Sequence, residues 1–152
     1  MLKLVNAKEY EEGIDKAIEY IHGVWGNDDN FMFYKDAIYH SHIEGKIPQF
    51  FLLLKEEKII GCSALIINDF ISRHDLYPWF ACLFVNKEER GNEYGKLLIK
   101  YAEQQAAKAG FDKLYLTTDL DGYYEKYEWN RIEDGIDLFT GKPTRIYLKE
   151  LS

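Results

Sequence analysis

Apolar residues recur along the chain in two spacings, one typical of strands and one typical of helices. Continuous or alternating apolar runs predict strands at residues 2–5, 50–54, 58–67, 79–85, 113–118, 129–138 and 144–148. A spacing of three to four residues predicts four helices. The first follows Asn6, the second covers residues 31–43, the third runs from residue 94 or 95 to residue 109, and a short fourth covers residues 121–127. This order predicts an α+β fold with a mixed, mostly antiparallel sheet flanked by helices, because antiparallel strands precede a crossover helix.

Local sequence signals mark where several of these elements begin and end. Asn6 is a good helix cap, and Glu9 three residues later completes a pair similar to a capping box. Gly110 stands directly after the third helix, at the position where a left-handed backbone ends many helices. Residues 55–57 form the charged tip of a hairpin, and residues 68–78 form a polar connection long enough to have a function of its own.

Composition and charge narrow the class of protein. With 152 residues, of which 47% are hydrophobic and 16% aromatic, the chain suits one globular domain over residues 1–152. The formal net charge of −7 argues against a nucleic-acid binder and favours cationic partners such as amines. The sequence has no signal-peptide core and no apolar run of membrane-spanning length, so we expect no membrane partner. Cys62 and Cys82 are too few for a disulfide framework, which favours a reduced, cytoplasmic location.

Residues 83–98 combine a buried strand end, a charged turn and a helix start. Gly91 and Gly95 remove side chains at the mouth of the helix, where roughly four N–H groups lack partners and the helix dipole adds about half a positive charge. This arrangement favours phosphate binding. It is not a P-loop, because three residues instead of four separate Gly91 from the glycine–lysine pair, and Leu97 replaces the hydroxyl that holds magnesium. A dinucleotide fingerprint also fails, since no third glycine falls in place.

The same stretch resembles the GNAT acyltransferase superfamily, whose signature is a hydrophobic strand, the motif R-G-x-G-x-G and an amphipathic helix. Arg90, Gly91 and Gly95 match this motif, and Glu93 stands where the family usually has its middle glycine. The predicted order of elements is also that of the family. The resemblance therefore covers nearly the whole chain.

Two further segments are similar to segments of this family. Residues 123–129 resemble its Y-E-K-x-G-F/W motif, with Glu128 where glycine is usual. Residues 68–79 resemble, more loosely, the connection before the fourth strand in small bacterial members. The chain is therefore identified as a small bacterial-type member of the superfamily.

The resemblance implies an N-acetyltransferase that moves an acetyl group from acetyl-CoA to a primary amine of a small, cationic molecule. The amine is expected to attack the thioester directly in a ternary complex, without a metal. In this family the fourth strand splays from the next one, so that a backbone N–H meets the acyl carbonyl and the pantetheine arm pairs as an added strand. The predicted cofactor-binding residues are Leu83, Phe84, Val85, Arg90, Gly91, Asn92, Glu93, Tyr94, Gly95, Lys96 and Asp119.

Tyr124 is the implied catalytic acid, because the tyrosine of its motif lies beside the acyl-CoA sulfur in the family and often protonates the departing thiolate. A phenol suits this role, since its pKa of about 10 lies close to that of an alkyl thiol. The base is left open between a water chain and acidic residues in connections expected to face the acceptor, which are Asp69, Asp75, Glu44 and Asp119. The first three of these are also the predicted substrate-binding residues.

Two alternatives remain open. One is a protein acetyltransferase that acts on a lysine or N-terminal amine, and the other is a non-catalytic acyl-CoA-binding sensor. The sensor stays an alternative because Glu93 and Glu128 stand at two positions where the family usually has glycine. At Glu93 we expect an ordinary backbone without a positive φ, and a carboxylate turned to water. We expect a monomer or a homodimer with no nucleic-acid partner.

Overall fold

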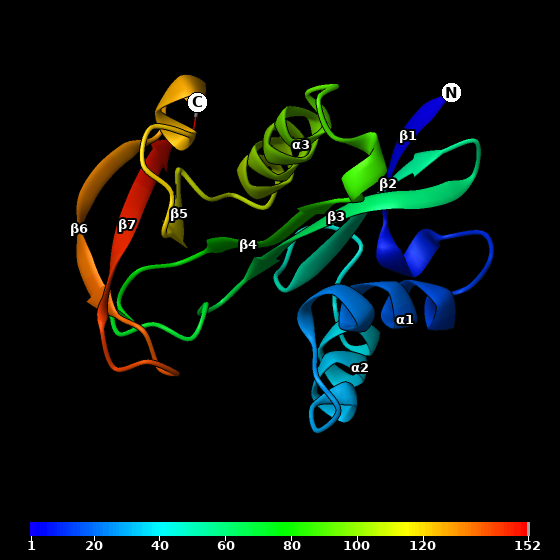
Figure 1. The fold of residues 1–152 in the computed structure, drawn as a ribbon, viewed down its shortest axis with the longest axis horizontal. Helices are drawn as coiled ribbons and strands as arrows, with labels where there is room; N and C mark the ends of the chain where they lie inside the picture. Colours follow the sequence, from blue (N-terminus) through cyan, green and yellow to red (C-terminus); the bar gives the residue numbers. More distant parts are fainter. Residues whose placement is uncertain (152) are drawn as a thin grey trace.

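The computed structural model describes residues 1–151, drawn as a ribbon in Figure 1. Seven strands within these residues form one sheet in the order β1-β2-β3-β4-β5-β7-β6. The strands are β1 (Leu2–Asn6), β2 (Gln49–Lys55), β3 (Lys58–Ile66), β4 (Trp79–Val85), β5 (Lys113–Thr118), β6 (Asn130–Ile136) and β7 (Pro143–Glu150). The helices are α1 (Ile14–Trp25), α2 (Phe31–Tyr39) and α3 (Tyr94–Lys108), and the short 3₁₀ turns are η1 (Ala7–Glu9), η2 (Lys87–Glu89) and η3 (Tyr124–Tyr127). Neighbouring strands are antiparallel except β4 with β5, so the predicted α+β class and mixed sheet are confirmed.

Helices cover both faces of the sheet, α3 on one side and α1 with α2 on the other (Figure 1). Alternate residues of β2 supply the two cores: Leu52 packs with α1 and α2, whereas Phe51 and Leu53 pack on the α3 side. Burial on both faces explains why β2 and β3 are continuous apolar runs in the sequence.

The sheet is nearly divided between β4 and β5. This parallel pair has a single paired position, Trp79 with Tyr115. On its other side, β4 stays paired with β3 as far as Val85. Most of β4 therefore has a hydrogen-bonding partner on one side only, and the splay implied by the family resemblance is present.

A β-bulge shapes the part of β4 that lies beyond this joint. The register with β3 shifts so that Cys82 and Leu83 lie opposite Ser63. Cys82 has φ +58°, a left-handed conformation that is uncommon for residues other than glycine. Its carbonyl accepts the indole N–H of Trp25 at 3.0 Å and the thiol of Cys62 at 3.3 Å. These two bonds hold the bulge from the α1 side of the sheet.

The first helix begins later than the sequence predicts. Asn6 caps only the short turn η1, through a bond from the N–H of Lys8 to its side chain. The chain then turns at Gly13, where φ is +108°, and α1 begins at Ile14. The glycine separates the two elements, because it adopts a backbone conformation that other residues avoid.

The second helix ends earlier than the predicted residue 43. α2 stops at Tyr39, and the segment after it follows a different path. The side-chain amide of Asn6 donates to the carbonyl of His42 at 2.9 Å and to that of Ile43 at 3.4 Å. These carbonyls are thereby tied to the end of β1, a contact that helical periodicity cannot reveal.

The remaining boundaries agree more closely with the sequence. Gly110 follows α3 with φ +95°, as predicted for a helix end. The short helix predicted over residues 121–127 is the 3₁₀ turn η3. Within residues 1–151, every helix is too short or too polar to span a lipid bilayer.

Candidate active site

The turn between β4 and α3 presents a row of free backbone donors. Within residues 1–151, the N–H groups of residues 91–95 donate to no protein acceptor. Helix α3 begins inside this row, has no side-chain cap and has no acidic residue in its first turn. Its N-terminus therefore offers unpaired donors and the positive end of the helix dipole, and an anion such as a phosphate fits both. We call residues 91–95 the amide cradle.

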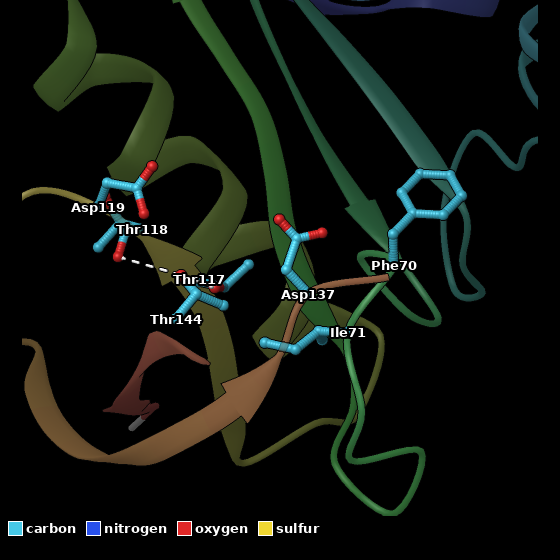
Figure 2. Close-up of a pocket in the computed structure, with 7 residues that line it drawn as sticks. All are labelled: Phe70, Ile71, Thr117, Thr118, Asp119, Asp137 and Thr144. Carbon is cyan, nitrogen blue, oxygen red and sulfur yellow. Dashed lines mark hydrogen bonds between the residues drawn. The ribbon is translucent and has the colours of Figure 1, made fainter. Parts of the chain in front are cut away.

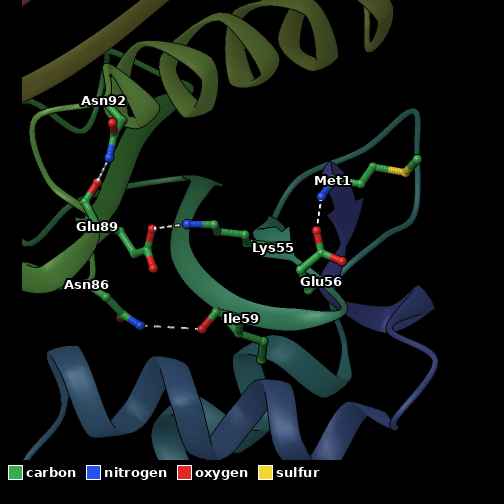
Figure 3. A network of polar contacts seen from close by, with 7 residues as sticks. All are labelled: Met1, Lys55, Glu56, Ile59, Asn86, Glu89 and Asn92. Atoms are coloured by element: carbon green, nitrogen blue, oxygen red, sulfur yellow. Dashed lines mark hydrogen bonds and ion pairs between the residues drawn. The ribbon is translucent and has the colours of Figure 1, made fainter.

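Side chains brace the turn that carries the cradle (Figure 3). Nε of Arg90 donates to the carbonyl of Val85 at 2.9 Å, and its guanidinium lies 5.2 Å from the ring centre of Phe84. The amide of Asn92 donates to the carbonyl of Glu89 at 3.0 Å, and the carboxylate of Glu89 accepts from Nζ of Lys55 at 2.9 Å. Arg90 thus closes the corner between β4 and the turn.

The two glutamates at glycine positions have left-handed backbones. Glu93 has φ +59° and ψ 27°, and Glu128 has φ +68° and ψ 31°. The expectation of an ordinary backbone at Glu93 is therefore wrong. A left-handed conformation costs a residue other than glycine about 1–2 kcal/mol. Both turns keep the conformation that glycine adopts easily, and both side chains are exposed.

Tyr124 lies in η3, close to the start of α3. Its neighbour Tyr123 reaches the cradle, since a Cβ added to Gly95 would lie 3.0 Å from the Tyr123 hydroxyl oxygen. Tyr124 itself is buried, and its ring packs against those of Trp129 and Tyr147. Burial, and then the charges of Tyr123 and Asp69, raise the pKa of the Tyr124 hydroxyl well above 10. The hydroxyl therefore stays protonated at neutral pH, but it is a weaker acid than an ordinary phenol, so the close pKa match with an alkyl thiol that the sequence led us to expect does not hold in this structure.

A cavity of about 160 Å³ lies where β5 ends (Figure 2). Three separate segments line it, namely the β3–β4 connection, the end of β5 and the β6–β7 hairpin. The lining residues are Phe70, Ile71, Thr117, Thr118, Asp119, Asp137 and Thr144. The β3–β4 connection is tied to the hairpin by a bridge between Ile71 and Asp137 and by a bond from the N–H of Leu138 to the carbonyl of Phe70 at 2.9 Å.

Asp69, next to this lining, is the acidic residue whose surroundings change its chemistry most. Burial raises the pKa of its carboxyl to about 7, and the negative charge of Asp137 adds to the effect. Asp69 in turn raises the pKa values of Tyr34, Cys82 and Tyr124. Its carboxylate therefore lies within electrostatic reach of the β4 bulge and of the predicted acid, and it accepts no hydrogen bond from any residue of the described chain.

The other acidic candidates lie in different surroundings. Asp75 accepts two bonds from Arg73, at 2.9 and 3.0 Å, and this partner lowers its pKa. Glu44 is exposed in the segment after α2 and lines neither described cavity. Asp119 lines both the first cavity and an adjoining one of about 190 Å³. The structure brings Asp69 and Asp119 toward one region but not Asp75 or Glu44.

Several residues of this region escaped the sequence analysis. Asp137, Thr117 and Thr144 reach the cavity because β5 pairs with β7 and the hairpin folds back on the β3–β4 connection. No motif surrounds them. Their only sequence signal is their position near one end of a predicted strand.

Comparison with known proteins identifies the class. Residues 14–128 match the family described as the acetyltransferase (GNAT) family, and the chain belongs to this family. The amino-acid acetyltransferase of Shewanella oneidensis is 30% identical over 105 residues, which are 69% of this chain but only 22% of that protein. This chain therefore spans about a fifth of the relative's length.

Two solved structures confirm the fold. An acetyltransferase of the GNAT family from Staphylococcus aureus superposes over the whole of both chains with a TM-score of 0.64 at 18% identity. An aminoglycoside 6′-N-acetyltransferase in complex with coenzyme A has a TM-score of 0.66 at 16% identity, over 90% of this chain and 89% of the other. At these identities the likeness extends to the fold and not to the acceptor.

Proposed function

We propose that this protein is an N-acetyltransferase that moves an acetyl group from acetyl-CoA to a primary amine of a small, cationic molecule. The observation that best supports this proposal is that the amide cradle lies beside an unpaired strand edge, with Tyr124 and Asp69 near the same edge. A phosphate-bearing ligand with an extended, amide-containing arm suits both features.

The residues present fit coenzyme A. The N–H groups of the amide cradle would hold its pyrophosphate, and the unpaired edge at Leu83, Phe84 and Val85 would pair with the amides of its pantetheine arm. Exposed Lys96 adds positive charge near the same turn. Asp119, which lies in the cavity lining, stays a predicted contact. The bound thioester supplies an activated acetyl group.

Asp69 is the base that the site supports best. An acceptor ammonium must lose one proton before its nitrogen can attack, and a carboxylate with a pKa raised to about 7 is a far better proton acceptor than an ordinary one. Asp69 also carries no competing hydrogen bond within the described chain. Asp75 is a weaker candidate, because Arg73 lowers its pKa.

The second proton transfer belongs to Tyr124. As the nitrogen bonds to the acetyl carbon and the carbon–sulfur bond breaks, the sulfur takes the hydroxyl proton of Tyr124. The second proton that the nitrogen sheds returns to the phenolate through solvent. A backbone N–H at the β4 bulge would polarise the acetyl carbonyl during the attack.

Measuring thiol release from acetyl-CoA with a panel of amines tests this proposal. The panel contains small alkylamines, polyamines, lysine peptides and peptides with free N-termini. We expect release that depends on a small amine and yields its N-acetyl product by mass spectrometry. Release with peptides alone would favour a protein acetyltransferase. Tight coenzyme A binding without release from any amine would favour a sensor.

A further inference from the structure

Three phenylalanines from distant segments form a row on the surface beside Asp69. Phe33 belongs to α2, Phe70 to the β3–β4 connection and Phe139 to the β6–β7 turn. The ring centres of Phe33 and Phe70 are 5.8 Å apart, and those of Phe70 and Phe139 are 5.2 Å apart. Phe33 is 55% exposed and Phe139 is 75% exposed. We call these three residues the aromatic row.

The row leads directly to the carboxylates of the candidate site. Phe70 follows Asp69 in the chain and lines the cavity together with Asp137, and Phe139 lies two residues after Asp137. Figure 2 shows Phe70 and Asp137 in this lining. An apolar surface therefore adjoins two acidic groups, Asp69 and Asp137, and burial together with the negative charge of Asp137 raises the pKa of Asp69.

We propose that the aromatic row binds the body of the acetyl acceptor, and that the acceptor is a primary amine with an aromatic group a few carbon atoms from its nitrogen. The inference rests on the proposed function, because the ammonium of such a molecule would lie at Asp69. Its positive charge complements the acidic pair, while its ring covers phenylalanines that otherwise face water. A polyamine or an amino sugar would leave the row uncovered.

The size of the row favours a small molecule over a protein. Three phenylalanine rings offer on the order of a few hundred Å², whereas a stable protein interface buries about 800 Å² on each partner. The ring of Tyr34 lies beside Phe33, and its hydroxyl is already engaged, because it donates to the carbonyl of Trp25 at 3.2 Å. A flat apolar group is the ligand that such a surface suits.

Four amines test the class of acceptor, namely phenethylamine, its cyclohexyl analogue cyclohexylethylamine, propylamine and spermidine. Initial rates of acetylation give KM and kcat for each amine. We expect phenethylamine to have a KM at least about tenfold below the values for propylamine and spermidine, with the cyclohexyl compound between them. Equal KM values for the first three amines, or a lower KM for spermidine, would overturn the inference.

Single substitutions then test the row itself. Phe33→Ala and Phe139→Ala should each narrow the preference for phenethylamine over propylamine by about threefold to tenfold, mainly through KM. Tyr39→Ala is the matched control, because Tyr39 is on the same helix as Phe33 and is 56% exposed. An equal loss of preference in all three variants, or no loss in the first two, would contradict the assignment.

Binding without chemistry separates this inference from the proposed function. Saturation-transfer NMR with phenethylamine and coenzyme A reports contact of the ring with the protein without any turnover. If no amine is acetylated but the ring signal is strong and is lost in Phe33→Ala, the proposed function fails while the aromatic subsite stands. If other amines are acetylated and no ring signal is found, the subsite alone fails. If Phe139→Ala elutes from a size-exclusion column at a different apparent molecular mass from the native protein, the row is instead an interface between two copies of the chain.

Discussion

The two halves of the candidate site are built in different ways. The proposed cofactor half consists of consecutive backbone groups at the end of β4 and the start of α3, in a turn braced by side chains such as Arg90 and Asn92. The proposed acceptor half consists of side chains from α2, the β3–β4 connection, the end of β5 and the β6–β7 hairpin. One half is local in the chain, and the other exists only after folding.

This difference affects which amino-acid substitutions each half can accept. A backbone cradle is expected to tolerate changes of side chain as long as the path of the chain is kept, and Glu93 keeps that path with a left-handed backbone. The proposed acceptor half should be less tolerant, because its charge and shape would come from side chains such as Asp69 and Phe70. Loops on a rigid scaffold commonly carry specificity in this way.

The largest expected effect is at the junction of the two halves. Tyr124→Phe should leave coenzyme A affinity nearly unchanged and lower kcat by roughly 10²- to 10⁴-fold, because it removes a positioned proton donor from the leaving sulfur. Steady-state rates at saturating substrates, with calorimetric titration of coenzyme A, measure both quantities. A kcat within about twofold of the native value would make Tyr124 a packing residue.

The next effect concerns the acceptor half alone. Asp69→Asn should lower kcat/KM by roughly 10²-fold and abolish its rise through about pH 7, because the pKa of the Asp69 carboxyl is raised to that region. Rates between pH 5.5 and 9 give this profile. Asp75→Asn is the matched control and should keep the native profile, since Arg73 lowers the pKa of Asp75.

The pH dependence of stability provides an independent test of the raised pKa of the Asp69 carboxyl. Its pKa is higher in the folded protein than the value of about 3.9 expected when unfolded, so folding disfavours the charged form. The native protein should therefore lose stability as the pH rises from about 4 through 7, and Asp69→Asn should lose less. The Tm of Asp69→Asn minus that of the native protein should therefore increase from pH 5 to pH 8. A difference that stays constant would contradict the raised pKa of Asp69.

A smaller effect is expected in the cofactor half. Glu93→Gly should bind acetyl-CoA about twofold to tenfold more tightly, most visibly at low salt, because it removes a negative charge from the cradle, and the relief of its left-handed strain should add to stability. Glu128→Gly is the control, since it relieves the same kind of strain outside the cradle. Both variants should gain stability, and Glu93→Gly alone should gain affinity by calorimetry. Weaker binding by Glu93→Gly would mean that its side chain holds the turn.

The smallest effect tests charge complementarity. Acetylation of cationic amines should weaken by a few-fold between about 0.05 and 0.2 M salt, because the net charge of −7 and the carboxylates near the cavity attract the ammonium from solution. The KM for a cationic amine over this range is the measurement. Equal activity on neutral amines, insensitive to salt, would place the attraction elsewhere.

The sequence predicted the two halves unequally, for the reason that separates them. The strand Trp79–Val85, the start of α3 at Tyr94 and the glycine turn follow from local spacing, so they were located closely. The early end of α2 was missed because it depends on bonds from Asn6, which is distant in the chain. Asp137 and Phe139 were missed for the same reason, since only strand pairing brings the hairpin to the β3–β4 connection.

Local rules also failed where the backbone is unusual. The positive φ of Glu93 was not expected, because propensity assigns this conformation to glycine. The left-handed Cys82 in the middle of β4 is similar, since its apolar surroundings indicate an ordinary strand residue. In both cases the path of the surrounding chain overrides the preference of the residue.

The two cysteines at the β4 bulge bear on how thiols in this protein react with disulfide reagents. Burial raises the pKa of Cys62 to about 12 and that of Cys82 well above its ordinary value, so neither is a reactive thiolate while the chain is folded. A coloured disulfide reagent added during turnover should therefore react with the released coenzyme A much faster than with Cys62 or Cys82. In denaturant the same reagent reacts with both protein thiols. One reagent can therefore measure the product released by the folded protein and, in a separate sample, the amount of unfolded chain.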